Sequence, residues 1–243
     1  MKNQLNNVYT LFTYPKYTLN NYLNRQIMVS NIFTIRAYDK YVITTTFWYT
    51  VYVLCTLLMK PEYKHPKFIS RLVSCMNATI LLFGSIAYNL NYLSLEWWTL
   101  MQAIPVGYCI YDSFLIASTD LFNDSKEMFI HHFAFALCIL LGWNKYYNEI
   151  STAYIAELTN LFLYPCWFLV TTHKYNEYPR VFKFLTVMLI LSFFFTRVLI
   201  FPYLTYTGFM LNEYISGTGM LVLSVMNIRW FHKLLNKAIS MNR

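Results

Sequence analysis

The sequence predicts an all-α membrane protein, a polytopic bundle of about seven transmembrane helices, and composition carries most of that prediction. Of the 243 residues, 57% are apolar and 20% are aromatic, whereas only 12% are charged. A soluble domain usually has about a quarter of its residues charged, so this chain carries about half of the usual solubilising charge. The mean hydropathy of +0.37 points the same way. These values favour a protein whose surface mostly faces lipid.

Apolar stretches along the chain have the lengths that membrane helices need. A helix that crosses a hydrocarbon core of about 30 Å needs about 20 residues at 1.5 Å per residue. The stretches at 103–119 and 128–143 are short for this and require tilting or shielding by neighbouring helices. Spans are predicted at 42–59, 72–90, 103–119, 128–143, 150–171, 181–205 and 213–231.

The segment before the first span has a different character. Residues 1–41 are polar and rich in Asn, but aromatic residues such as Tyr9, Phe12 and Tyr17 recur in them. Aromatic side chains in a polar segment favour the headgroup level of a membrane. We therefore divide the chain into an interfacial segment, 1–41, and a transmembrane domain, 42–240.

Basic residues lie between the predicted spans and do not form a nucleic-acid surface. The net charge is +8, but no basic cluster on a polar domain accompanies it, so we expect no nucleic-acid partner. Lys and Arg concentrate at 60–71, at 174–183 and in the carboxyl-terminal tail. Under the positive-inside rule, this pattern favours a cytoplasmic carboxyl terminus.

Few ionisable residues fall within the predicted spans, and such residues are functional candidates because they are costly in hydrocarbon. Asp112, His131 and His132 lie within about 10 Å of the predicted cytoplasmic face, by helical rise, so the carboxylate can reach an imidazole. Glu157 and Arg197 lie about 10–12 Å from the opposite face, in consecutive spans where their charges can neutralise each other. The sequence thus predicts two separate polar sets.

Both sets also have structural interpretations. An ion pair between Glu157 and Arg197 that only fixes helix register is at least as compatible with the pattern as a substrate site. The two histidines can equally be interfacial or hydrogen-bonded groups. Adjacent residues point about 100° apart on a helix, which disfavours a metal held between them, and five histidines are too few for a membrane di-iron enzyme. We expect neither a metal nor another cofactor.

Five sequence segments carry a family resemblance. They are Gly107–Asp112 (G-Y-x-x-x-D), Met128–Phe133 (x-x-x-H-H), Ala156–Leu163 (E-x-S/T-x-x-F-L), Phe193–Arg197 (an aromatic run ending in Arg) and Met226–Phe231 (N-x-x-W-F). In this order, and across residues 42–240, they resemble the TLC-domain (TRAM–LAG1–CLN8) membrane proteins, most closely the TLCD branch and more distantly the ceramide synthases.

This resemblance implies lipid metabolism or lipid homeostasis at the endoplasmic reticulum or another endomembrane. Ceramide synthases of the family transfer an acyl chain from acyl-CoA to a sphingoid base, with the histidine pair central. The resemblance therefore implies membrane lipids and acyl-CoA as partners. The catalytic candidates are His131, His132 and Asp112. The binding candidates are Glu157, Asn160 and Arg197.

One departure from the ceramide synthase pattern leaves alternatives open. The His-Asp and following Asp of those enzymes have no equivalent in the segment 157–160, and Phe135 stands near the place of their threonine. TLCD-type proteins are linked instead to phospholipid composition and membrane fluidity. The chain is thus either a ceramide-synthase-like or phospholipid-related acyltransferase or a non-enzymatic modulator of lipid composition. A small-solute transporter or channel, or a seven-span receptor, are the alternatives, although no inverted repeat supports transport.

Overall fold

The computed structural model describes residues 36–119, 121–141 and 147–241. The chain divides into two units, residues 1–39 and 40–243, and the description below concerns the second. Almost all of the predicted interfacial segment, 1–41, lies outside the described residues, so that assignment stays a prediction. In the described residues the structure is helical throughout and contains no strand.

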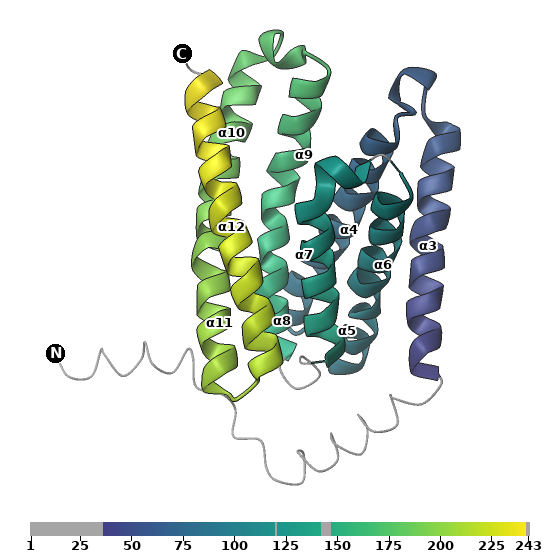
Figure 1. Cartoon of the computed structure of the whole chain (residues 1–243), viewed down its shortest axis with the longest axis vertical. Coiled ribbons are helices and arrows are strands. Elements are labelled where there is room, and N and C mark those ends of the chain that lie inside the picture. The colour runs from purple at the N-terminus through teal and green to yellow at the C-terminus, as the bar shows by residue number, and fades with distance from the viewer. Residues whose placement is uncertain (1–35, 120, 142–146, 242–243) are drawn as a thin grey trace, which may run out of the picture. The chain divides into compact units, whose positions relative to one another are not determined.

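The helices follow one another with short connections (Figure 1). They are α3 (Arg36–Leu58), α4 (Pro66–Asn89), α5 (Leu95–Met101), α6 (Ala103–Ser118), α7 (Leu121–Leu141), α8 (Tyr147–Tyr154), α9 (Leu158–Thr171), α10 (Pro179–Phe193), α11 (Ile200–Met210) and α12 (Tyr214–Met241). A 3₁₀ turn, Ile155–Glu157, joins α8 to α9, and a π-helix, η6 (Phe194–Leu199), joins α10 to α11.

Within the described residues, every predicted span overlaps a helix, which confirms the all-α membrane bundle. In the described part of the chain, five helical stretches are long and apolar enough to cross a membrane. They are Asp39–Leu58, Pro66–Asn89, Trp97–Ser118, Ser151–Thr171 and Pro179–Met210. The other two predicted spans correspond to α7 and α12, which run beside these stretches in the bundle (Figure 1) and include charged residues such as Glu127 and Arg229.

The second span begins earlier than the predicted residue 72. Pro66 opens α4, because proline suits the first turn of a helix, and the His65 side chain accepts a hydrogen bond from the Lys67 backbone N–H at 3.2 Å. Arg71 therefore lies inside a membrane helix and not in a connection. This difference becomes important at the cavity described below.

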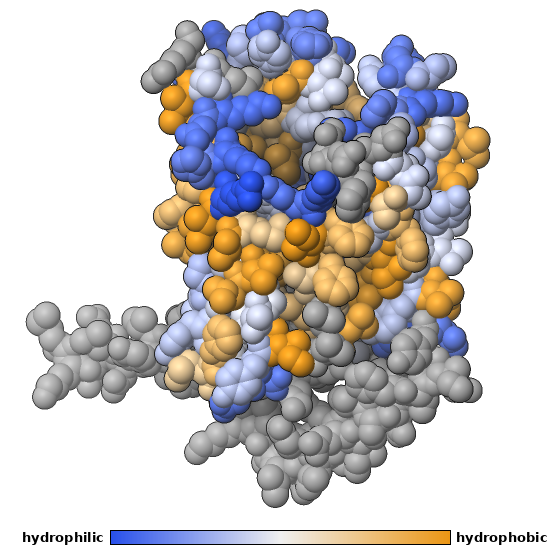
Figure 2. All heavy atoms as spheres, in the orientation of Figure 1, coloured by the Kyte–Doolittle hydropathy of each residue, from blue (hydrophilic) through white to orange (hydrophobic). Residues whose placement is uncertain are grey.

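The bundle encloses its polar groups between inner helices and exposes apolar side chains outward. Helix α7 packs against α6 and α12, and α9 packs against α4 and α10. The outer α3 exposes Ile43, Leu57 and Leu58, and Figure 2 shows hydrophobic residues spread over the lower part of one face, with hydrophilic residues gathered above them. Such a distribution suits a helix surface that contacts lipid.

A glycine allows α3 to approach α6 closely. A Cβ atom at Gly107 would lie 2.7 Å from the Thr45 backbone nitrogen, closer than real Cβ atoms come to other atoms. Thr44 uses this proximity to donate a hydrogen bond from Oγ1 to the Ala103 carbonyl oxygen at 2.9 Å. The contact fixes the start of α6 and hence the direction of Asp112, which follows little more than one turn after Gly107.

Candidate functional site

Both predicted polar sets meet at one cavity of about 300 Å³. The sequence placed His131 and His132 near one membrane face and Glu157 and Arg197 toward the other, yet all four side chains line this cavity. The prediction of two separate sets is therefore wrong, because the inner helices place side chains of both sets around one cavity. Figure 2 shows the molecular surface hollowed beside the hydrophilic residues of that face.

One wall of the cavity carries His132, which contacts the Asp112 carboxylate; Asp112 itself is not one of the lining residues. His132 of α7 places Nδ1 3.3 Å from Oδ2 of Asp112 of α6, and both side chains are almost fully buried. Ser70 of α4 donates a hydrogen bond from Oγ to Asp112 Oδ1 at 2.9 Å. The His132 contact has the distance of an ion pair without the alignment of a hydrogen bond. The predicted reach between Asp112 and a histidine is present in the structure.

The second histidine of the pair lies on an adjoining part of the wall. The His131 ring lies 5.3 Å from the Trp230 ring of α12 and stacks on Phe135 at 6.3 Å. His132 instead meets the Tyr108 ring of α6 edge-on at 5.4 Å. The pair thus faces two directions, as expected for helix neighbours. No group of three or more His, Cys, Asp or Glu side chains able to hold a metal occurs among the described residues.

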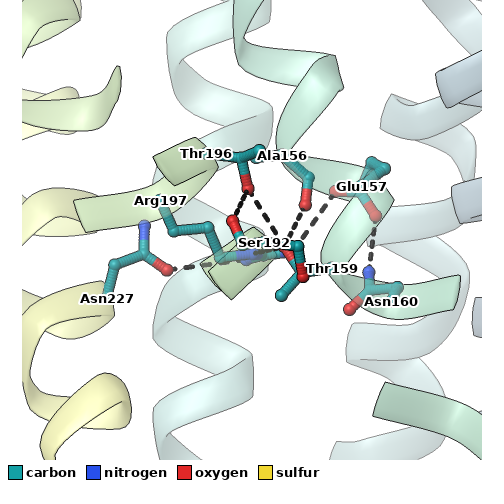
Figure 3. A network of polar contacts seen from close by, with 8 residues as sticks. All are labelled: Ala156, Glu157, Thr159, Asn160, Ser192, Thr196, Arg197 and Asn227. Carbon is teal, nitrogen blue, oxygen red and sulfur yellow. Dashed lines mark hydrogen bonds and ion pairs between the residues drawn. The ribbon is translucent and has the colours of Figure 1, made fainter. Parts of the chain in front are cut away.

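Another part of the cavity lining is organised around Arg197, which three helical segments hold (Figure 3). Arg197 Nε donates a hydrogen bond to Thr159 Oγ1 of α9 at 3.0 Å, and Nη1 donates to Asn227 Oδ1 of α12 at 3.5 Å. Arg197 Nη2 lies 3.8 Å from Glu157 Oε1, while Asn160 Nδ2 donates to Glu157 Oε2 at 2.6 Å. The three binding candidates therefore belong to one network.

The network also contains residues that the sequence did not single out. Thr159 is fully buried and lies 3.2 Å, oxygen to oxygen, from the hydroxyl of Thr196. Asn227 is equally buried on α12. Both residues lie inside segments that carry the family resemblance, and this was the sequence signal that could have identified them as site residues. The π-helix that bears Arg197 was not predictable from hydropathy, although such bulges often accompany functional sites.

A third carboxylate lies where α7 and α12 meet beside the cavity. Glu127 accepts a hydrogen bond from Trp230 Nε1 at 2.7 Å and from Lys233 Nζ at 2.9 Å, and Arg229 lies 3.1 Å away. The hydrogen bond from Trp230, with that from Lys233 and the charges of both cations, lowers the pKa of Glu127 below its ordinary value. This group, called here the Glu127 cluster, ties the Trp230 side of the cavity to the start of α7.

The comparisons with known proteins give one match. The family model of the TLC domain (TRAM, LAG1 and CLN8) matches residues 67–236. No curated protein and no solved structure is significantly similar to the chain. The matched region contains α6, α7, α9 and η6, and hence both walls of the cavity.

Proposed function

Because the chain belongs to the TLC-domain family of multi-pass membrane proteins, we propose that it acts on membrane lipids through its internal cavity. Apolar side chains such as Leu81, Leu163 and Phe201 line much of the cavity, and these suit an acyl chain. A few polar groups, the histidines and the Arg197 network, complete the lining, and a mostly apolar pocket with a few placed polar groups is typical of a ligand site. The occupant in this proposal is a lipid with its polar end at the histidines.

The contact between His132 and Asp112 is the observation that carries a catalytic form of this proposal. A small rotation of the imidazole would align Nδ1–H with the carboxylate 3.3 Å away, which would hold the proton on Nδ1 and leave Nε2 as the basic atom. The Ser70 hydroxyl holds the carboxylate in place through its hydrogen bond at 2.9 Å. A base oriented by a carboxylate is the arrangement that proton transfer to and from an acyl acceptor requires.

The proposed reaction is acyl transfer from a thioester such as acyl-CoA to a hydroxyl or amine of a lipid. His132 Nε2 takes the proton of the acceptor as its oxygen or nitrogen attacks the thioester carbonyl carbon. The carbon–sulfur bond then breaks, and the departing thiolate receives the proton from His132, so the base is restored. Asp112 stabilises the imidazolium that exists between the two proton transfers. His131 lies beside the reacting groups, against Trp230 and Phe135.

A second candidate function is lipid binding without turnover. The segment 157–160 lacks the paired aspartates of ceramide synthases, and Glu157 is instead engaged by Asn160 and Arg197. A chain with these contacts would alter membrane composition by sequestering or presenting a lipid. The histidine pair would then line a binding cavity only.

Comparison of cellular lipids by mass spectrometry separates the two forms. Cells would express the wild type, the double variant His131→Ala/His132→Ala, and His232→Ala as a control that removes an exposed histidine of α12. Matched expression and a monodisperse profile in detergent would verify folding. A lipid class changed by the wild type and by His232→Ala but not by the double variant supports catalysis. A change that persists in the folded double variant supports binding alone, and no change in any sample contradicts both.

A further inference from the structure

Arg71 is a cavity-lining cation that has no counter-ion among the described residues. It lies half-buried on α4 and contributes to the cavity wall. Within the part of the chain that the structure describes, it forms no ion pair or hydrogen bond. The buried Arg197, in contrast, has partners on two neighbouring helices and on the turn that precedes α9. The two cavity arginines therefore differ in whether side chains of the described protein pair with their guanidinium groups.

The acidic groups near Arg71 are already engaged elsewhere. Asp112 accepts from Ser70 and contacts His132, and Glu157 accepts from Asn160 and lies beside Arg197. With His neutral, the lining residues carry two cations against the single carboxylate of Glu157. A partly buried guanidinium without a counter-ion is costly, so the cavity offers a favourable site for an anion.

The position of Arg71 on its helix indicates where that anion would lie. Arg71 is about 7–8 Å along α4 from its first residue, by helical rise, which places it toward the headgroup level and not at the bilayer centre. Arg71 shares the cavity lining with His132 and Tyr164. Arg229 and Lys233, which share one carboxylate in the Glu127 cluster, add positive charge on the α12 side.

We propose that Arg71 binds a phosphate group of the lipid that occupies the cavity, and so selects an anionic acyl ligand over a neutral one. A guanidinium donates paired hydrogen bonds to phosphate oxygens in a fixed fork, which a lysine ammonium does not reproduce. The acyl chain then extends past His132 toward Leu81 and Phe201 on the apolar side of the cavity. This inference rests on the proposed occupation of the cavity by a lipid, and not on acyl transfer.

Two sources could supply the phosphate, and binding measurements distinguish them. The full chain would be purified in an uncharged maltoside detergent, without phospholipid. Radiolabelled phosphatidic acid, palmitoyl-CoA and diacylglycerol would be titrated separately, with inorganic phosphate as a competitor that lacks an acyl chain. The variants are Arg71→Gln, Arg71→Lys and Lys64→Gln, the last of which removes an exposed charge before α4 and outside the cavity lining.

Arg71→Gln is expected to weaken binding of phosphatidic acid, palmitoyl-CoA or both by about tenfold or more, with an intermediate loss in Arg71→Lys. Diacylglycerol binding, and all binding to Lys64→Gln, should stay within about twofold of the wild type. A loss confined to palmitoyl-CoA assigns the phosphate to the coenzyme, and a loss confined to phosphatidic acid assigns it to a phospholipid headgroup. Either result supports the inference.

Unchanged affinity of Arg71→Gln for both anionic ligands overturns the inference. An equal loss for diacylglycerol also overturns it, because Arg71 would then only support the fold, and so does a wild type that binds none of the probes. The variant His131→Ala/His132→Ala keeps this test apart from the proposed reaction. Arg71-dependent binding in that variant supports the inference independently of the reaction, whereas a wild type that shows Arg71-dependent binding but no turnover contradicts acyl transfer and leaves the inference intact.

Discussion

The two polar walls of the cavity differ in how completely their charged groups are satisfied. On the α9 side, the Arg197 guanidinium has partners in Thr159, Asn227 and Glu157, although the uncharged Nδ2 of Asn227 has no partner among the described residues. On the α7 side, Nδ1 of His131 and Nδ1 of His132 lack a well-formed hydrogen bond among the described residues, and His132 has a single carboxylate at 3.3 Å.

This difference favours a structural role for the Arg197 network and a chemical role for the histidines. Buried polar groups in proteins are usually hydrogen-bonded, and an unsatisfied one calls for a functional explanation. The Arg197 network joins segments of the bundle that are far apart in sequence, as a register-fixing network does. The histidine wall keeps groups that can exchange protons with a ligand.

Removal of His132 should have the largest effect, and this effect should be a lower rate of acyl transfer. In His132→Ala, the transfer rate is expected to fall by about 10²–10⁴-fold, the contribution of a general base. The melting temperature should change much less than the rate. The measurement is thiol release from acyl-CoA by purified protein, with His232→Ala as the matched control. A rate in His132→Ala equal to that of the wild type would contradict the role of this wall.

Removal of Arg197 should instead affect the fold. In Arg197→Met, Glu157 loses the cation 3.8 Å away and Thr159 loses the donor at 3.0 Å. Breaking a buried pair by removing one partner costs about 3–5 kcal/mol, so the variant should unfold at a clearly lower temperature. Thermal unfolding in detergent measures this loss. A fully stable Arg197→Met protein would show that the network does not hold the bundle together.

A smaller change in the same network should give a smaller loss of stability. Thr159→Val preserves the side-chain shape but removes the acceptor of Arg197 Nε and the hydroxyl 3.2 Å from Thr196 Oγ1. An unsatisfied buried donor costs about 1–3 kcal/mol. Thr56→Val on α3 is a matched control, because its hydroxyl donates to its own helix at the Tyr52 carbonyl. Equal melting temperatures of the two variants would argue against the network.

The Glu127 cluster should make the smallest contribution to the stability of the fold, and this contribution should depend on pH. The pKa of Glu127 is lowered in the folded protein, mainly by the hydrogen bond from Trp230. Its contribution to stability is therefore complete above the unfolded pKa of about 4.5 and is lost as pH falls through the lower folded pKa. Because Glu127 is about one-third exposed, water and salt screen the contribution.

The expected result is a melting temperature of Glu127→Gln below that of the wild type at pH 7, by no more than about 2 °C. The two melting temperatures should converge at the lowest pH at which both proteins remain folded. A difference that grows as the pH falls would have the wrong sign and would contradict the assignment. Melting curves from pH 4 to pH 7 at fixed salt measure it.

Sequence reasoning could predict the helices and the contact between Asp112 and a histidine. Hydropathy located each span because apolar length is what a bilayer requires, and helical rise placed Asp112 and His132 at similar depths. Sequence reasoning could not predict that Glu157 and Arg197 line the same cavity as the histidines. That arrangement depends on how the helices pack and on the π-helix at 194–199. Arg71 was assigned to a connection because charge near a span end is normally a topology signal. The cytoplasmic location of the carboxyl terminus stays a prediction.

The most direct test of the central claim follows a labelled acyl chain from thioester to lipid. The wild type and His132→Ala would be placed in nanodiscs containing a total lipid extract, supplied with labelled palmitoyl-CoA, and analysed for free thiol and for labelled lipid. The account predicts equal amounts of thiol and acylated lipid from the wild type, and a loss of both in His132→Ala that retains its fold. Product formation no greater than in empty nanodiscs, or undiminished in His132→Ala, would contradict it.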